Sequence, residues 1–179
     1  MEKVETVVNS EAPGAHLVPI GSVDPAAVEH LLDLAFGADR HGRTAYRLRA
    51  GVAAEPQASC AALDAQGALV GSLQSWPLAL TAANGQVTPL WLVGPIAVHP
   101  DRRNEGIGRA MLRRALDAID ETGIIAVLIG DAPYYAPFGF AAAQTQRWAL
   151  PGPVDRARLL ARTERGIVLP ADGVLGPRR

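Results

Sequence analysis

The sequence has little cysteine and no long apolar run. A single cysteine, Cys60, among 179 residues excludes an internal disulfide framework and a site with several cysteine ligands, which suits a reducing compartment. No apolar run approaches the roughly 20 residues that a membrane-spanning helix needs. The first residues carry acids where a secretory signal has an apolar core. We therefore expect a cytoplasmic protein without a membrane partner.

An excess of one charge is also missing. Seventeen basic and eighteen acidic side chains leave a formal net charge of −1, so no overall field attracts nucleic acid, and we expect no nucleic-acid partner. His16, His30 and His41 are too scattered in the sequence for a set of metal ligands, so we expect no metal. Any site for an anion must be local.

The apolar pattern alternates between strand and helix types, which predicts an α/β fold. Asp24 before Pro25 is typical of a helix start, and Gly37 and Gly123 stand where two helices are expected to end. Pro95 cannot donate a hydrogen bond to a neighbouring strand, so Gly94-Pro95 predicts a bulge or a parting of strands. The pattern predicts strands at 16–20, within 58–80 (two), at 86–98, 124–130 and 146–150, and helices at 25–36, 43–50, 107–122 and 153–164.

The stretch HPDRRNEGIGRAML, residues 99–112, lies between a predicted strand and a predicted helix. The helix has arginines early and acids late, the reverse of the order that its macrodipole favours. An anion bound at the helix N-terminus would explain the arginines, because free backbone N–H groups and the dipole attract it there. The alternative is a solvated arginine-rich face with glycines that permit a turn.

The spacing of these glycines differs from that of a P-loop, and it is a poor fit to a dinucleotide-binding turn. Residues 103–108, RNEGIG, instead match the R/Q-x-x-G-x-G/A loop of the GNAT superfamily of acyl-CoA-dependent N-acetyltransferases, and IAVHPDRR before it resembles that family's strand end. Downstream, YYAPFGF resembles the family's Y-x-x-x-G-F segment at the usual interval. The chain is therefore similar to GNAT enzymes, most strongly over residues 88–140.

The resemblance implies an α/β fold with a mixed, splayed sheet flanked by helices, and acetyl-CoA as co-substrate. The strands ending near Val98 and Gly130 would part to admit the pantetheine arm, which would pair with the backbone of Ile96 and Val98. N–H groups from Arg103 to Arg109 would hold the pyrophosphate. The resemblance thus assigns to the cofactor Ile96, Val98, Arg103, Asn104, Glu105, Gly106, Ile107, Gly108 and Arg109.

The resemblance also places Tyr135 near the sulfur of CoA as the general acid that protonates the leaving thiolate. The alternative is that Tyr135 belongs to an aromatic packing cluster in the YYAPFGF segment. A general base stays unassigned: Asp131 is a candidate that also fits a helix N-cap, and His99 is expected on the surface. Cys60 is expected to be a small buried hydrophobe rather than a nucleophile.

The segment between the first two predicted helices would border the acceptor entrance in this fold. Its arginines favour a carboxylate-bearing acceptor or form solvated surface. They are Arg40, Arg43, Arg47 and Arg49.

We expect a flexible N-terminus at 1–14, a single GNAT-like acetyltransferase domain at 15–150, and a C-terminal extension at 151–179 packed on or near it, with the last ten residues mobile. The extension is a candidate for core packing, a homodimer contact or a cover over the acceptor pocket. The expected function is acetyl transfer to a primary amine of a small molecule or peptide. Two alternatives stay open: a non-catalytic acyl-CoA-binding regulatory module and a domain for another phosphate ligand.

Overall fold

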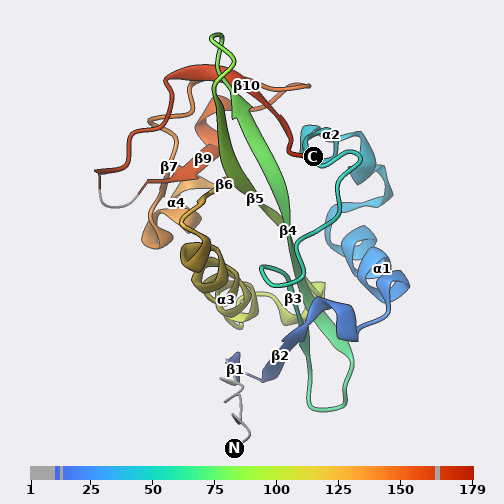
Figure 1. Cartoon of the computed structure of the whole chain (residues 1–179). Coiled ribbons are helices and arrows are strands. Elements are labelled where there is room, and N and C mark those ends of the chain that lie inside the picture. Colours follow the sequence, from blue (N-terminus) through green and yellow to red (C-terminus); the bar gives the residue numbers. More distant parts are fainter. Residues whose placement is uncertain (1–10, 13, 164–165) are drawn as a thin grey trace, which may run out of the picture.

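The computed structural model describes residues 11–12, 14–163 and 166–179, whose strands form one ten-stranded sheet (Figure 1). The strand order is β1-β2-β3-β4-β5-β6-β9-β7, with β10 paired to β4 and β8. The strands are β1 Glu11–Ala12, β2 Ala15–Pro19, β3 Cys60–Leu63, β4 Leu69–Thr81, β5 Val87–Val98, β6 Ile125–Ile129, β7 Phe140–Ala141, β8 Arg147–Ala149, β9 Leu159–Arg162 and β10 Asp172–Pro177. The α-helices are α1 Pro25–Phe36, α2 Thr44–Leu48, α3 Ile107–Thr122 and α4 Ala132–Tyr135.

The sheet is mixed, as predicted. The pairs β5–β6 and β8–β10 are parallel, and the other pairs along the order are antiparallel. The chain passes from β5 through α3 to β6, which is the crossover that joins parallel neighbours. This crossover places the 99–106 loop and the start of α3 at the end of β5.

The side chains of β5 alternate between two apolar cores. Trp91 and Val93 belong to the core beneath α3, whereas Leu90 and Leu92 belong to the core formed with the C-terminal strands, because successive residues of a strand point to opposite faces. In Figure 1, α3 lies on one side of β4 and β5, and α1 and α2 lie on the other. The central strands are thus covered on both faces.

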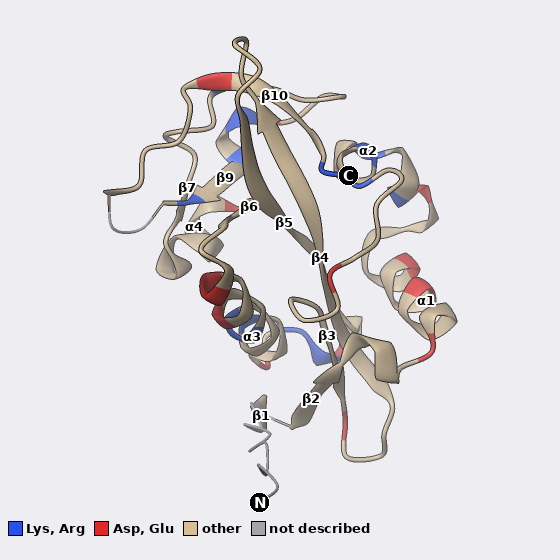
Figure 2. Cartoon of the chain, viewed as in Figure 1, with Lys and Arg blue, Asp and Glu red and all other residues tan. Residues whose placement is uncertain are grey.

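Helix α3 combines an apolar face with an unusual order of charges. Its buried residues include Met111, Leu112 and Ile119, at the spacing of one helix face. Figure 2 shows acidic residues towards its C-terminal end and basic residues in the preceding loop, as the sequence predicts. The helix boundaries predicted at Asp24 and Gly123 are confirmed: the Asp24 side chain accepts a hydrogen bond from the Ala26 amide, 2.9 Å, and Gly123 follows α3.

The C-terminal part differs from the sequence-based expectation. The helix predicted at 153–164 is wrong, because Arg156–Arg158 form a short 3-10 turn and Leu159–Arg162 form β9. β9 pairs with β6 and β7, so its consecutive apolar residues are buried by the sheet and not by one helix face. The expectation of mobile final residues is also wrong, because β10 pairs with β4.

The predicted strand at 146–150 is present as β8, whose partner is β10. The division into 1–14, 15–150 and 151–179 stays a prediction, and residues 1–10 and 13 lie outside the described residues. No helix in the described part of the chain is both long and apolar enough to cross a membrane.

Candidate active site

β5 and β6 pair over a short stretch and then separate. Their register runs from Leu90 opposite Ile125 to Leu92 opposite Val127, yet β5 continues to Val98 and β6 to Ile129. We call this place the strand parting. The edge of β5 beyond Leu92 is therefore not paired by β6.

The Gly94-Pro95 pair stands at the strand parting, and its peptide bond is cis. Between the pairs Ser75–Val93 and Leu73–Ile96, β5 contains one residue more than β4. This is the bulge that the sequence predicted. The Trp76 indole N–H of β4 donates a hydrogen bond of 2.9 Å to the Gly94 carbonyl oxygen, which satisfies a backbone acceptor that a regular ladder would otherwise use.

A cleft of about 720 Å³ opens at the strand parting. The ends of β5 and β6 line it, together with residues of α4, of the segment 153–158, of α1 and of α2. The lining residues that the following argument uses are Arg40, Arg43, Tyr46, Arg49, Gly94, Ile96, Val98, Arg103, Gly108, Gly130, Asp131, Tyr134, Tyr135, Asp155 and Arg158.

The loop before α3 turns sharply to start the helix. Gly106 has a φ of 84°, a left-handed conformation that glycine adopts without a steric cost. Within the described part of the chain, no side chain caps the N-terminus of α3, so N–H groups of its first turn point out of the helix without an intrahelical acceptor. Arg102 has a local role instead: its Nε donates to the Glu105 carboxylate at 2.7 Å, and its Nη2 donates to the Gly14 carbonyl oxygen at 3.0 Å.

The predicted cofactor residues lie along one path at the cleft. Ile96 and Val98 on β5, Arg103 in the loop and Gly108 in α3 line it. The other predicted residues are in the same loop or the first turn of α3: Asn104, Glu105, Gly106, Ile107 and Arg109. Of these, Ile107 is 1% exposed, with its side chain in the core, so only its backbone can face a ligand.

Tyr135 lines the cleft and also packs among aromatic rings. Its ring centroid lies 4.8 Å from that of Tyr134 and 6.1 Å from that of Phe140. The ring lies so close to Gly130 that an added Cβ there would be 2.3 Å from Tyr135 Cε2. Burial raises the pKa of Tyr135 to about 12, with smaller contributions from Tyr134 and Asp131. The phenol therefore stays protonated at neutral pH.

Asp131 and Asp155 supply carboxylates to the described part of the cleft, and each has a partner. Asp131 Oδ1 lies 3.4 Å from Arg158 Nε, and Asp155 accepts a 3.0 Å hydrogen bond from the Ala157 amide. Asp131 occupies the N-cap position of α4, as one interpretation predicted, although its side chain makes no capping bond. His99 does not line the cleft, and its Nδ1 accepts a 3.3 Å hydrogen bond from the Asp101 amide.

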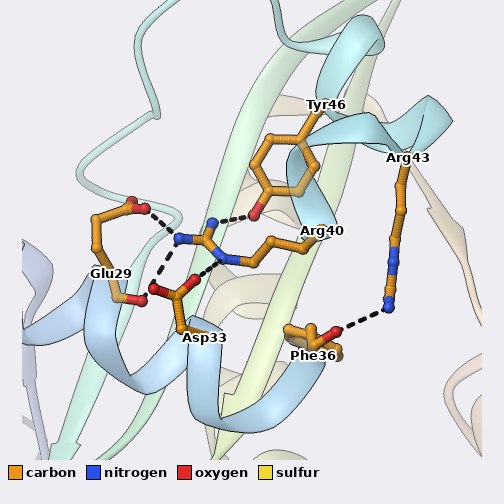
Figure 3. A network of polar contacts seen from close by, with 6 residues as sticks. All are labelled: Glu29, Asp33, Phe36, Arg40, Arg43 and Tyr46. Carbon is orange, nitrogen blue, oxygen red and sulfur yellow. Dashed lines mark hydrogen bonds and ion pairs between the residues drawn. The ribbon is translucent and has the colours of Figure 1, made fainter. Parts of the chain in front are cut away.

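The opposite side of the cleft carries Arg40, Arg43 and Arg49, which we call the arginine wall. Arg40 is 1% exposed. Its guanidinium donates to the Asp33 carboxylate at 2.8 Å, to the Glu29 carboxylate and to the Tyr46 hydroxyl, as Figure 3 shows. Burial alone would lower the pKa of Arg40, but these hydrogen bonds outweigh it and raise the pKa above its usual value.

Cys60 is buried away from the cleft. Cys60 is 1% exposed in the core beneath α3, and burial raises the pKa of its thiol to about 12. A thiol of this kind is a poor nucleophile. Among the described residues, no group of three His, Cys, Asp or Glu side chains lies close enough to hold a metal ion.

Comparison with known proteins adds an independent observation. A family model described as an acetyltransferase (GNAT) domain matches residues 21–143. The chain belongs to the GNAT acetyltransferase family. Comparison with the curated proteins gives no match.

Solved GNAT structures resemble this acetyltransferase over most of its length. The GNAT family N-acetyltransferase YhbS of Escherichia coli, in complex with CoA, has 22% identity and a TM-score of 0.70, covering 94% of this chain and 92% of that one. A GNAT acetyltransferase of Brucella melitensis, in complex with acetyl-CoA, has 22% identity and a TM-score of 0.63, covering 93% and 97%. Eis1 of Mycobacterium abscessus has 25% identity and a TM-score of 0.51, covering 79% and 36%. The GNAT fold predicted from the sequence is confirmed.

Several residues of this acetyltransferase's cleft were missed by sequence reasoning. One feature of the sequence indicated part of the Glu29–Asp33–Arg40 contacts: two acids that are four residues apart lie on the same face of a helix. Their arginine partner lies beyond the end of that helix, so only the path of the chain brings the three together. Arg158 was assigned to a helix, and its pairing with Asp131 follows from β9 lying beside β6.

Proposed function

We propose that this chain transfers an acetyl group from acetyl-CoA directly to a primary amine of a small molecule or peptide. The observation that carries the proposal is the strand parting, which leaves one edge of β5 unpaired by β6 between the uncapped start of α3 and Tyr135. Membership of the GNAT family and the complexes of the two relatives with CoA and acetyl-CoA support the same donor.

The donor would bind along β5 and α3. A pantetheine arm carries amide groups, so it would pair with the free backbone edge near Ile96 and Val98 as an added strand does. The pyrophosphate would accept hydrogen bonds from N–H groups between Arg103 and Arg109, where the helix dipole favours negative charge. Arg103 lines the cleft and would add a charged side-chain contact.

In the transfer step, the amine nitrogen attacks the thioester carbonyl carbon. The C–N bond forms, the C–S bond breaks, the nitrogen loses a proton and the sulfur leaves as thiolate. Tyr135 would donate its O–H to this sulfur as the charge develops. With a pKa of about 12, the phenol is protonated and can donate. The proton need not be fully transferred before the thiolate leaves, because thiols have a pKa of about 8.5 and their thiolates are good leaving groups.

We assign no side chain as the general base. Asp131 Oδ1 lies 3.4 Å from Arg158 Nε, so this carboxylate is already engaged by a guanidinium. The Asp131 side chain is 76% exposed, so water reaches the same place. The proposal therefore has the proton of the amine leave to solvent.

Two measurements test the proposal. Acetyl-CoA and CoA should raise the melting temperature, whereas ATP and NAD should not; at one hundred times Kd the stabilisation is about 2.7 kcal/mol. Release of the CoA thiol should then depend on an added amine from a library of small amines and peptides. Stabilisation without thiol release for any amine would favour the acyl-CoA-binding module, and stabilisation by ATP or NAD would favour another phosphate ligand.

A further inference from the structure

The arginines of the cleft differ in whether they are already engaged. Arg40 has two carboxylates and the Tyr46 hydroxyl as hydrogen-bond acceptors (Figure 3). Arg43 donates from Nη2 to the Phe36 carbonyl oxygen at 2.9 Å, and Figure 3 shows it directed towards that residue. Arg158 is paired with Asp131. These three arginines have functions within the fold.

Arg49 is the exception on the arginine wall. Its Nη1 is buried and has no hydrogen-bond partner within the described residues, although the side chain lines the cleft. Burial lowers the pKa of Arg49, and the Tyr46 hydroxyl and Glu29 only partly offset this. A buried donor without an acceptor is costly, so an arginine retained in this state needs a reason.

Two aromatic rings hold the Arg49 guanidinium in place. Its central carbon lies 3.8 Å from the centroid of the Tyr46 ring and 4.5 Å from that of the Trp76 ring. The Tyr46 ring is itself fixed, because its hydroxyl accepts from Arg40. A guanidinium held over aromatic rings still has N–H groups at its edges for hydrogen bonding.

The stacked guanidinium lies close to the strand parting. The Trp76 ring, against which it packs, donates through its indole N–H to the Gly94 carbonyl oxygen at 2.9 Å. Gly94 lines the cleft and belongs to the bulge of β5. A group bound by Arg49 would therefore lie beside the place where the proposed function puts the thioester.

We propose that Arg49 binds a carboxylate of the acceptor, so that the substrate is a small amine that also carries a carboxylate, such as an amino acid. A carboxylate is planar and presents two acceptor oxygens, which match two N–H groups of a guanidinium edge. It would accept hydrogen bonds from the N–H groups through which Arg49 lines the cleft. The inference rests on the proposed acetyl transfer and names the substrate class of that same cleft.

Pairs of acceptors that differ only in the carboxylate test this inference. Suitable pairs are lysine and cadaverine, arginine and agmatine, tyrosine and tyramine, and tryptophan and tryptamine. Thiol release gives kcat/KM for each member with the wild type, Arg49→Met and Arg49→Lys. For each pair, the preference of an enzyme is kcat/KM for the carboxylated amine divided by kcat/KM for the decarboxylated one. The preference of the wild type divided by the preference of Arg49→Met gives a ratio in which the different basicity of the two amines cancels.

We expect this ratio to be roughly ten- to a hundredfold, the range for a hydrogen bond to a charged group. Arg49→Met should lower kcat/KM for the carboxylated member and leave that of the decarboxylated member within about twofold. Arg49→Lys should retain part of the preference, because an ammonium keeps the charge and loses the two-pronged geometry. Arg47→Met is the matched control, since Arg47 is exposed two residues earlier in α2, donates to the Pro151 carbonyl oxygen at 2.8 Å and does not line the cleft.

The outcomes separate the two proposals. A melting-temperature shift with acetyl-CoA that is the same for the wild type and Arg49→Met shows that the donor site is intact. Given that shift, a ratio near one, or turnover of decarboxylated amines alone, overturns the role of Arg49 and leaves acetyl transfer standing. Absence of both the shift and thiol release overturns the proposed function and this inference with it.

Discussion

The donor side and the arginine wall of the cleft are built in different ways. The donor side consists of β5, the 99–106 loop and α3, which follow one another in the sequence, and its key groups are backbone N–H and a free strand edge. The arginine wall consists of charged side chains from residues 40–49, fixed by acids of α1 and by Trp76 of β4. Backbone groups survive most side-chain changes, whereas the wall depends on individual side chains. Substitutions in the arginine wall can therefore change the acceptor that the cleft binds, while the donor side continues to bind the same donor.

The largest effect should come from removing the acids that support the wall. In the double variant Glu29→Gln/Asp33→Asn, the buried charge of Arg40 loses both carboxylates. We expect a loss of about 3 kcal/mol in the free energy of unfolding, the lower end of the range for a buried charge left unpaired, because the two carboxylates are half exposed. Urea unfolding measures the loss.

The control for this variant makes the same change of charge on α3. Asp117→Asn/Glu121→Gln alters two exposed acids of α3 and should change stability by less than about 0.5 kcal/mol. Equal losses in the two double variants would mean that total charge matters and the Arg40 contacts do not.

The next effect concerns Tyr135 of α4, the proposed proton donor to the CoA sulfur. Tyr135→Phe keeps the ring against Phe140 and removes the proposed proton donor. We expect kcat to fall about a hundredfold, the lower end for general acid catalysis, with an unchanged Kd for CoA. Tyr134→Phe is the control, since its ring also packs beside Arg109, and it should leave kcat within about threefold. A wild-type rate for Tyr135→Phe would restrict this residue to packing.

The close approach of Gly130 to Tyr135 offers a milder test of the same tyrosine. In Gly130→Ala, the new Cβ would be 2.3 Å from Tyr135 Cε2, so the ring must move. We expect a loss of about 1–3 kcal/mol of stability, as in other overpacked sites, together with a lower kcat. Gly21→Ala is the control, because nothing lies within 4 Å of its added Cβ. An unaltered kcat in Gly130→Ala would show that the position of this ring does not limit the rate.

The smallest effect is a slope of stability with pH. Burial raises the pKa of Tyr135 from 10.0 to about 12, so the folded protein retains a proton that the unfolded chain loses. The stabilisation is complete below pH 10 and disappears as the pH rises through about 12. Unfolding free energies at several alkaline pH values should fall more steeply for the wild type than for Tyr135→Phe. Parallel curves would contradict the shift. Cys60, which contributes to both curves, cancels in the difference.

The donor side could be predicted from the sequence because its signals are local. The apolar spacing of α3, the glycines of the 99–106 loop and the Gly94-Pro95 pair lie within one continuous stretch. The arginine wall could not, since a run of arginines has the same appearance whether each side chain is solvated, paired or stacked. Only the fold distinguishes Arg40, which has its acceptors, from Arg49, whose Nη1 has no acceptor among the described residues.

Strands β9 and β10 escaped prediction for another reason. The apolar run Leu159–Ala161 fits either one turn of a helix or a buried strand, and it becomes β9 because it pairs with β6 and β7. β10 contains two glycines and a proline and has weak strand character. It forms because it pairs with β4, whose residues are far away in the sequence.

The pairing of β10 has a consequence for how the protein is made. β5 covers one edge of β4, while β3 covers the other edge at Leu69–Leu73 and β10 covers it at Leu78–Thr81. With translation at roughly 5–20 residues per second, β10 leaves the ribosome on the order of ten seconds after β4. During that interval the far half of β4 is an open strand edge that a second nascent chain can join. Slow translation of the last third of the message would prolong this exposure and lower the yield of native enzyme.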